Sequence, residues 1–262
     1  MLSSRIIPCL LLQGQGLVKT IGFKDPKYVG DPINAIRIFN TKEVDELVLL
    51  DISATPENRG PAWKQIAEVA GECFMPLCYG GGVQTMQDVE KIFSLGVEKV
   101  ALNTAAFSKP DLVRAAVKAF GGQSIVASID VKKNWLGKSE AYTQAGRKGT
   151  KLDPVSYARR MEDLGVGEIF LNSIDRDGTM QGYDIPLIKS VTGAVGVPVV
   201  ACGGAGQNAD FSAAIFQGGA SAAAAGSLFV FKGKHRAVLI TYPGPDELKQ
   251  LLSAPNSAFP PA

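Results

Sequence analysis

Glycine-rich turns that could bind an anion occur twice in this sequence. One reads CYGGGV from Cys78 to Val83, and the other reads CGGAG from Cys202 to Gly206. Each lies between a short apolar run and a segment with helical spacing, where backbone N–H groups free of side chains can surround a phosphate. A tight turn without a ligand is the simpler interpretation of either motif alone. The predicted phosphate-binding glycines are Gly81, Gly82, Gly203 and Gly204.

Polar residues at the ends of two further strand-like runs would complete these sites. Asn103-Thr104 follows the run after the first glycine turn, and Gly226-Ser227 follows the run after the second. Each pair would add backbone N–H groups and a hydroxyl. Two sites imply a substrate with an anionic group at each end. The alternative is that the turns are inherited structure and that only one, or neither, binds an anion.

Two aspartates are candidates for proton transfer. Asp130 ends the apolar run SIVASID, and Asp177 precedes Gly178 in the loop DRDGT. A partly desolvated carboxylate at such a position can act as a general acid or base. The alternatives are that Asp130 pairs with Lys132 and that an aspartate of the DRDGT loop only holds the turn.

Two basic residues are further candidates for a role in chemistry. Lys19 follows the first strand-like run and could cover a phosphate, although a lone lysine is more often solvated. The sole histidine, His235, lies in KGKHR beyond the last run, so a structural or surface role is expected. Ser-His-Asp catalysis is therefore not predicted.

The elements that must position these residues are repeated along the chain. The prolines that precede the two glycine turns lie 122 positions apart (198 − 76). The two Asp-Pro helix starts are separated by the same distance in sequence (153 − 31). Between them, VDELVLLDISAT parallels VGEIFLNSIDRD. A fixed offset with one order of elements indicates an internal duplication. The repeated positions are Pro76 and Pro198, and Asp31-Pro32 and Asp153-Pro154.

Strand-like runs alternate with helical patterns throughout. Strands are predicted at 5–12, 46–51, 75–79, 98–102, 124–131, 168–173, 197–201 and 221–225. Helices are predicted at 32–44, 59–71, 84–95, 110–120, 153–164, 184–193, 208–217 and 245–252. Eight βα units favour an α/β fold that closes as a (βα)8 TIM barrel, with a doubly wound open sheet as the alternative. The barrel would span 1–252 as two duplicated (βα)4 halves, about 1–123 and 124–252, before a flexible tail at 253–262.

Composition and charge argue against several classes of function. The chain of 262 residues is 46% hydrophobic and 20% charged, with a net charge of +2, which makes no case for nucleic-acid binding. No apolar stretch has the length of a membrane span, and the apolar start is interpreted as a first strand. The four cysteines lack CxxC spacing, so free thiols in a reducing cytoplasm are expected. Neither a metal nor a cofactor is predicted.

Four charged residues lie where predicted strands begin, at the end of the barrel opposite the glycine turns. Two positive and two negative side chains there could form a ring across the barrel floor. Solvated strand ends are the alternative. The residues are Arg5, Glu46, Lys99 and Glu168.

With these motifs in place, the chain resembles the cyclase subunit of imidazole glycerol phosphate synthase, the HisF family, throughout its predicted barrel. The resemblance is carried by CYGGGV, LNTAA, SIDVK, NSIDRDGT, GYD and CGGAG. It implies a barrel that takes ammonia from a docked HisH-like glutaminase at its N-terminal face, through a charged gate formed by the four floor residues. It also implies two phosphate sites at the loops described above, Gly178 included, with Lys19 on a mobile first loop.

One position departs from the family pattern. The family uses two catalytic aspartates, which end the first and fifth strands; Asp130 matches the second, whereas Leu11 occupies the first. Leucine cannot transfer a proton, and losing one of two cooperating acid–base groups costs about 10²–10⁴-fold in rate.

Three segments are similar to a diverged branch of this family: CLLLQGQGLVKTIGFKDPKYVGDPINAIRIFN at 9–40, ECFMPLCYGGG at 72–82 and FVFKGKHRAVLITYP at 229–243. That branch works with a glutaminase-like subunit and a separate amidotransferase to form acetamidino sugars of bacterial surface polysaccharide. The resemblance implies an ammonia-delivering subunit whose small-molecule ligand is phosphorylated or a sugar nucleotide. The alternatives are a genuine cyclase of histidine biosynthesis, with Asp130 and Asp177 sharing the proton transfers, and a non-catalytic scaffold.

Overall fold

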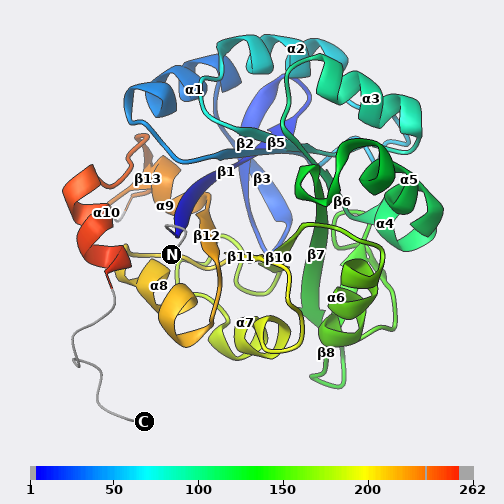
Figure 1. Ribbon diagram of the computed structural model, residues 1–262. Helices are drawn as coiled ribbons and strands as arrows, with labels where there is room; N and C mark the ends of the chain where they lie inside the picture. The colour runs from blue at the N-terminus through cyan, green and yellow to red at the C-terminus, as the bar shows by residue number, and fades with distance from the viewer. Residues whose placement is uncertain (1–3, 234, 254–262) are drawn as a thin grey trace.

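Eight parallel strands close into a barrel in the computed structural model, which describes residues 4–233 and 235–253 (Figure 1). Pairing of β12 with β1 and of β7 with β10 leaves no free edge in the ring, so the (βα)8 barrel is confirmed and the open sheet is excluded. In order around the barrel, the strands are β1 (Arg5–Gln13), β4 (Leu47–Asp51), β5 (Leu77–Gly80), β6 (Lys99–Leu102), β7 (Ile125–Lys133), β10 (Glu168–Ser173), β11 (Val199–Cys202) and β12 (Ala222–Ala225).

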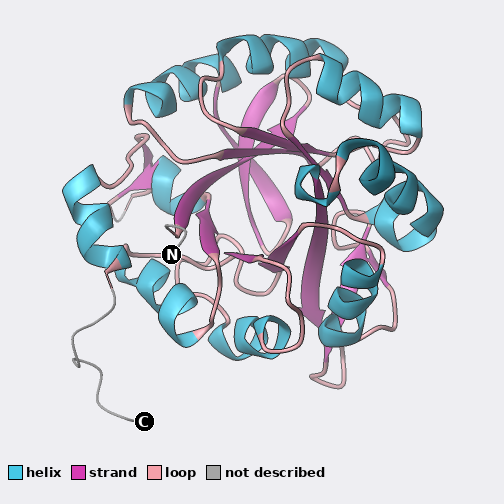
Figure 2. Ribbon diagram, viewed as in Figure 1, coloured by secondary structure: helices cyan, strands magenta, loops and turns pink. Residues whose placement is uncertain are grey.

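Helices surround the barrel (Figure 2). They are α1 (Pro32–Thr41), α2 (Trp63–Glu72), α3 (Met86–Ser94), α5 (Pro110–Phe120), α6 (Pro154–Asp163), α7 (Ile185–Thr192), α8 (Ala209–Ser212), which continues as a π-helical turn at Ala213–Gln217, and α10 (Pro245–Leu252). The predicted Asp-Pro starts are present: the side chains of Asp31 and Asp153 accept the N–H groups of Asn34 and Ser156 at 2.9 and 3.0 Å. Within the described residues, no helix combines the length and apolar character needed to cross a membrane.

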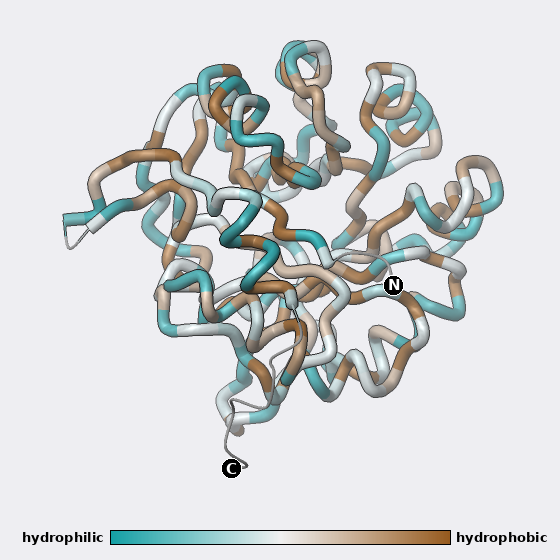
Figure 3. Tube along the Cα trace, turned by 60° about the vertical axis from the view of Figure 1, so that its left-hand side comes forward, coloured by the Kyte–Doolittle hydropathy of each residue, from teal (hydrophilic) through white to brown (hydrophobic). Residues whose placement is uncertain are grey.

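Alternation along the strands divides the buried residues into two sets. In β1, Ile6, Leu10 and Leu12 pack outward in the large core under the helices, whereas Ile7 and Cys9 face the barrel interior. Apolar and polar stretches also alternate along the outer helices in Figure 3. The barrel interior is filled mainly by small and branched apolar side chains, so its axis is a packed core.

The main differences from the predicted elements lie at the strand ends. Antiparallel hairpins follow three barrel strands, and short helices follow two. These additions were not predicted because they lie in stretches without strong periodicity. They are β2 (Gly16–Ile21) with β3 (Lys24–Gly30), β8 (Ser139–Thr143) with β9 (Lys148–Gly149), β13 (Phe231–Lys232) with β14 (Ala237–Val238), a 3₁₀ turn (Gly122–Ser124), α4 (Thr104–Ser108) and α9 (Ser227–Val230).

Two predicted helix boundaries were wrong. The helix predicted to start at 59 begins at Trp63, because Arg59 is held in the preceding loop by Asp51. The helix predicted to reach 44 ends at Thr41, and Glu43 beyond it has a left-handed φ of 52°. The flexible tail predicted for 253–262 lies, apart from Ser253, outside the described residues.

Structural parallels between the halves extend the sequence repeat. A hairpin follows both β1 and β7, the first strands of the two halves, and each half has a short helix after its fourth strand. The half boundaries at about 123 and 252 stay a prediction, but the parallels place equivalent glycine turns on opposite sides of one barrel end.

Candidate active site

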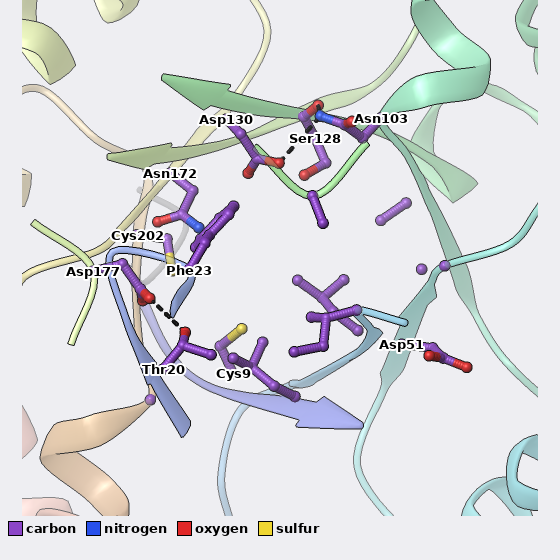
Figure 4. Close-up of a pocket in the computed structure, with 18 of the residues that line it drawn as sticks. Cys9, Thr20, Phe23, Asp51, Asn103, Ser128, Asp130, Asn172, Asp177 and Cys202 are labelled. Atoms are coloured by element: carbon purple, nitrogen blue, oxygen red, sulfur yellow. Dashed lines mark hydrogen bonds between the residues drawn. The ribbon is translucent and has the colours of Figure 1, made fainter. Parts of the chain in front are cut away.

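A cavity of about 340 Å³ opens at the carboxyl ends of the barrel strands, where a TIM barrel carries its chemistry (Figure 4). The structure brings all the predicted catalytic and phosphate-binding residues to its lining, although their roles stay predictions. These residues are Lys19, Gly81, Gly82, Asn103, Thr104, Asp130, Asp177, Gly178, Gly203, Gly204, Gly226 and Ser227. His235 is exposed in the turn between β13 and β14 and is not part of the lining.

Close backbone approach explains the glycines of the two turns. A Cβ added to Gly81, whose φ is +121°, would lie 2.4 Å from the carbonyl oxygen of Asp51. A Cβ added to Gly204, whose φ is +116°, would lie 2.2 Å from the carbonyl oxygen of Gly182. Both positions combine a left-handed backbone with a contact that no side chain could tolerate. The turns therefore present bare backbone at the cavity.

An aspartate–arginine pair holds the loop beside the first glycine turn. Arg59 donates from Nη1 to Asp51 Oδ2 at 2.7 Å and from Nη2 to Asp51 Oδ1 at 2.9 Å. Asp51 also accepts the backbone N–H groups of Ser53 and Ala54. The carboxylate is fully engaged and buried, so Asp51 has a structural role although it lines the cavity.

Asp130 and Leu11 face each other across the cavity. Asp130 lies in β7 and Leu11 in β1, four strands away around a ring of eight, and both point inward by the alternation of their strands. Asp130 is 8% exposed, and its Oδ2 accepts a hydrogen bond of 3.3 Å from Asn103 Nδ2. Burial, with added repulsion from Asp177 and a partial offset by Asn172, raises the pKa of Asp130 to about 7. This carboxyl is suited to take or give a proton near neutrality.

The raised pKa of Asp130 predicts a specific pH dependence of stability. Because the folded state binds this proton more tightly than the unfolded chain, stability is lost as the pH rises toward the folded pKa. The wild type should lose about 1.4 kcal/mol more than an Asp130→Asn variant between pH 6 and 8. Urea unfolding of both proteins across this range measures the difference. Parallel curves would show that Asp130 is ionised with an ordinary pKa.

The hairpin β2–β3 lies across the cavity and is tied to the loop after β10. Thr20 Oγ1 donates to Asp177 Oδ2 at 2.9 Å, and the N–H of Gly22 donates to the carbonyl of Asp177 at the same distance. Burial raises the pKa of Asp177, although Thr20 and Lys19 oppose the shift. Lys19 lies on this hairpin and donates to the carbonyl of Cys9 at 2.5 Å. Its Nζ would be 2.2 Å from a Cβ added to Gly226, so the ammonium lies beside the second candidate phosphate site.

Several cavity residues were missed by sequence reasoning. Thr20 gave no signal, because it lies in a hairpin that was not predicted. Asn172 interrupts an apolar strand and could have been found in this way; it pairs in register with Asp130 and lies between Asp130 and Asp177 in Figure 4. Its Oδ1 is buried without a hydrogen-bond partner in the described part of the chain. Arg147 also lines the cavity, from the turn between β8 and β9.

The four floor residues form the ring that their positions predicted. Lys99 Nζ donates to both oxygens of Glu46, at 3.0 and 2.9 Å, and to Glu168 Oε2 at 2.9 Å. Arg5 completes the ring with hydrogen bonds to both glutamates. The glutamate side chains are only 4% and 7% exposed, so the alternative of solvated strand ends is wrong. Burial lowers the pKa of Lys99, but attraction to Glu168 and Glu46 outweighs it, and the pKa is raised overall.

Apolar side chains fill the barrel between this ring and the mouth cavity. Ile7, Val48, Cys78, Val126 and Phe170 belong to this interior cluster. Such an interior disfavours ions, because a desolvated charge without a partner is costly. A gate role for the ring stays a prediction.

The sequence matches one protein-family model and several proteins named as HisF subunits. The family model described as "Histidine biosynthesis protein" matches residues 5–236. The chain is 57% identical over 248 residues to the Pseudomonas aeruginosa protein named "Putative imidazole glycerol phosphate synthase subunit hisF2", with 95% of this chain and 99% of that protein covered. It is 48% identical over 253 residues to the Vibrio vulnificus protein named "Putative imidazole glycerol phosphate synthase subunit hisF3", covering 96% and 97%. It is 45% identical over 232 residues to the Hyphomonas neptunium "Imidazole glycerol phosphate synthase subunit HisF", covering 88% and 91%.

Proposed function

The chain belongs to the histidine biosynthesis protein family, whose relatives here carry the name of HisF subunits, and on this basis we propose an ammonia-accepting role. In this proposal the barrel receives ammonia from a partner glutaminase and conducts it from the floor ring to the mouth. The ammonia then serves amidation, as an acetamidino group, of a bacterial surface-polysaccharide sugar. The protein is proposed to act in the cytoplasm, where glutamine and activated sugars are available.

The observation that carries the proposal is Leu11 at the mouth. The position opposite Asp130 holds a side chain that cannot transfer protons, while the floor ring of four charged residues is complete. Ring closure needs protein side chains that act together as acid and base toward the substrate. Delivery of ammonia does not need such a pair. The proposal therefore assigns ammonia delivery, and not ring closure, to this chain.

The floor is the proposed docking face for a HisH-like glutaminase. A partner that releases ammonia beside Arg5, Glu46, Lys99 and Glu168 would place it at the entrance of the apolar interior. A separate amidotransferase is the proposed consumer of ammonia at the mouth. There the two glycine turns, with Lys19, are proposed to hold the phosphate groups of a phosphorylated or sugar-nucleotide compound.

A genuine imidazole glycerol phosphate cyclase is the second candidate. Asp130, with its pKa near 7, and Asp177 line one cavity and could divide the proton transfers between them. This candidate requires Asp177 to do what the family's first aspartate does. The hydrogen bond from Thr20 Oγ1 to the Asp177 carboxylate argues against this, because it occupies one of the two oxygens that would have to exchange protons with the substrate.

Two assays test the proposal directly. Glutamate release by a candidate glutaminase from the same organism should rise about tenfold or more on addition of this chain, within the usual range of coupling between sites. Absence of both binding and stimulation would contradict the ammonia-accepting role. The gene should not rescue a histidine auxotroph that lacks its own cyclase, and rescue would favour the second candidate.

A further inference from the structure

Two hairpins cross the mouth of the barrel, each reaching from one half to the candidate phosphate site of the other. The hairpin β2–β3 of the first half carries Lys19 to Gly226 in the second half. The hairpin β8–β9 of the second half reaches Asn103 and Thr104 in the first half. There the N–H of Gln144 donates to Thr104 Oγ1 at 3.0 Å, and Asn103 Nδ2 donates to the carbonyl of Tyr142 at 3.1 Å.

The two hairpins touch over the cavity. Phe23, in the turn of the first hairpin, packs on Gly146, in the turn of the second: a Cβ added to Gly146 would lie 2.9 Å from the Phe23 ring. Phe23 also lines the cavity and appears beside it in Figure 4. The arms from the two halves therefore form one cover, and residues in their turns face whatever binds beneath.

The two candidate sites differ in the cation already beside them. Lys19 is buried next to Gly226, so the second site has an ammonium in place. The first site, at Gly81–Gly82, has Asn103, whose amide also donates to the Asp130 carboxyl. An anion bound there would be repelled whenever Asp130 is ionised, because both charges share a poorly solvated cavity. A cation facing the first site would remove this penalty.

Arg147 is placed to be that cation. It follows Gly146 in the turn of the hairpin β8–β9, which is hydrogen-bonded to Thr104 through Gln144, and it lines the cavity. No side chain in residues 4–233 or 235–253 forms a hydrogen bond or ion pair with its guanidinium. Arg147 and the neighbouring Lys148 are both exposed, but only Arg147 contributes to the lining of the cavity.

We propose that Arg147 binds the anionic group held at Gly81–Gly82, as the counterpart of Lys19 at Gly226–Ser227. A molecule with a phosphate at each end would then be bound by both hairpins. The hairpin of the first half contributes Lys19 to the site in the second half, and the hairpin of the second half contributes Arg147 to the site in the first half. The planar guanidinium can donate two parallel hydrogen bonds to one phosphate, which an ammonium cannot do. This inference deepens the proposed function, since it rests on a phosphorylated small molecule binding at the mouth.

Inorganic phosphate is the probe that tests Arg147. Isothermal titration of the full chain at low ionic strength should show two sites in the wild type. Arg147→Gln should weaken one site about tenfold and leave the other unchanged, and Lys19→Met should do the reverse. The double variant should weaken both. Arg147→Lys should recover part of the lost affinity, and the matched control Lys148→Gln should bind like the wild type.

Three results would overturn the inference. The first is a wild type that does not show two phosphate sites, and the second is an Arg147→Gln variant that binds phosphate at both sites as tightly as the wild type. The third is a Lys148→Gln variant that binds phosphate as weakly as Arg147→Gln does, because this would reveal only a general effect of charge. Phosphate binding is measured without a glutaminase, so it fails independently of the proposed function. If this chain stimulates the glutaminase but Arg147→Gln binds phosphate like the wild type, only this inference fails. If Arg147→Gln weakens phosphate binding but the chain does not stimulate the glutaminase, only the ammonia-accepting role fails.

Discussion

Replacing Glu168 with Gln is expected to destabilise the barrel by about 3 kcal/mol, because it breaks a buried ionic ring. Glu168 accepts from Arg5 through one oxygen and from Lys99 through the other. Its loss leaves two cations sharing Glu46 at a site where the glutamate side chains are almost inaccessible to water. Removing one partner of a buried pair costs more than the pair contributes, since an uncompensated charge remains.

Urea unfolding of wild type and variant measures this loss. The matched control is Glu72→Gln, which breaks the pair between Glu72 and Arg37. Both side chains are solvent-accessible, so this variant should lose much less stability than Glu168→Gln. Lys99→Met should also destabilise the protein when made alone. The double variant Lys99→Met with Glu168→Gln should be more stable than the sum of the two losses predicts, because one charge of each sign has been removed.

The same variants separate a structural ring from a gate. If the ring controls ammonia entry, the double variant should fold but transfer less ammonia per glutamine hydrolysed by the partner. Equal costs for Glu168→Gln and Glu72→Gln would show that the ring is solvated in solution. Unchanged transfer in a folded double variant would leave the ring with a role in stability only.

The barrel could be predicted from sequence because its signals are periodic and repeated. Apolar runs such as that ending at Asp130 alternate with amphipathic segments, and the 122-residue offset fixes the order of elements. Prediction failed where structure depends on specific side-chain contacts within loops or on turns. A helix predicted to start at 59 begins at Trp63 instead, because Asp51 binds Arg59 in the preceding loop. The residue types of Asp51 and Arg59 alone do not reveal that they pair.

The candidate site was predictable to the extent that strand ends mark it. Asp130 and the glycine turns end strands, and the fold places all strand ends at one mouth. Thr20 and Arg147 could not be found in this way, because they reach the cavity on hairpins that leave the barrel and return over it. Asn172 could have been found, since an amide inside an apolar strand needs a polar partner or a ligand.

Replacing Leu11 with Asp is expected to raise the rate of imidazole glycerol phosphate formation by about 10²-fold, when ammonium salt supplies the ammonia. Leu11 points inward at the end of β1, on the side of the cavity opposite Asp130. A carboxylate there would restore the second of two acid–base groups, with the reacting molecule between them. Turnover of the family's bisphosphorylated substrate, followed by product formation, measures the gain.

Two controls make the gain specific to a pair of carboxylates. Leu11→Asn introduces a polar side chain of similar size that cannot take a proton, and it should give no increase. Adding Asp130→Asn to Leu11→Asp should remove the increase, because each group needs the other when protons are transferred on both sides of one substrate. A Leu11→Asp variant no faster than the wild type would show that the mouth has diverged from cyclase chemistry in more than this one side chain.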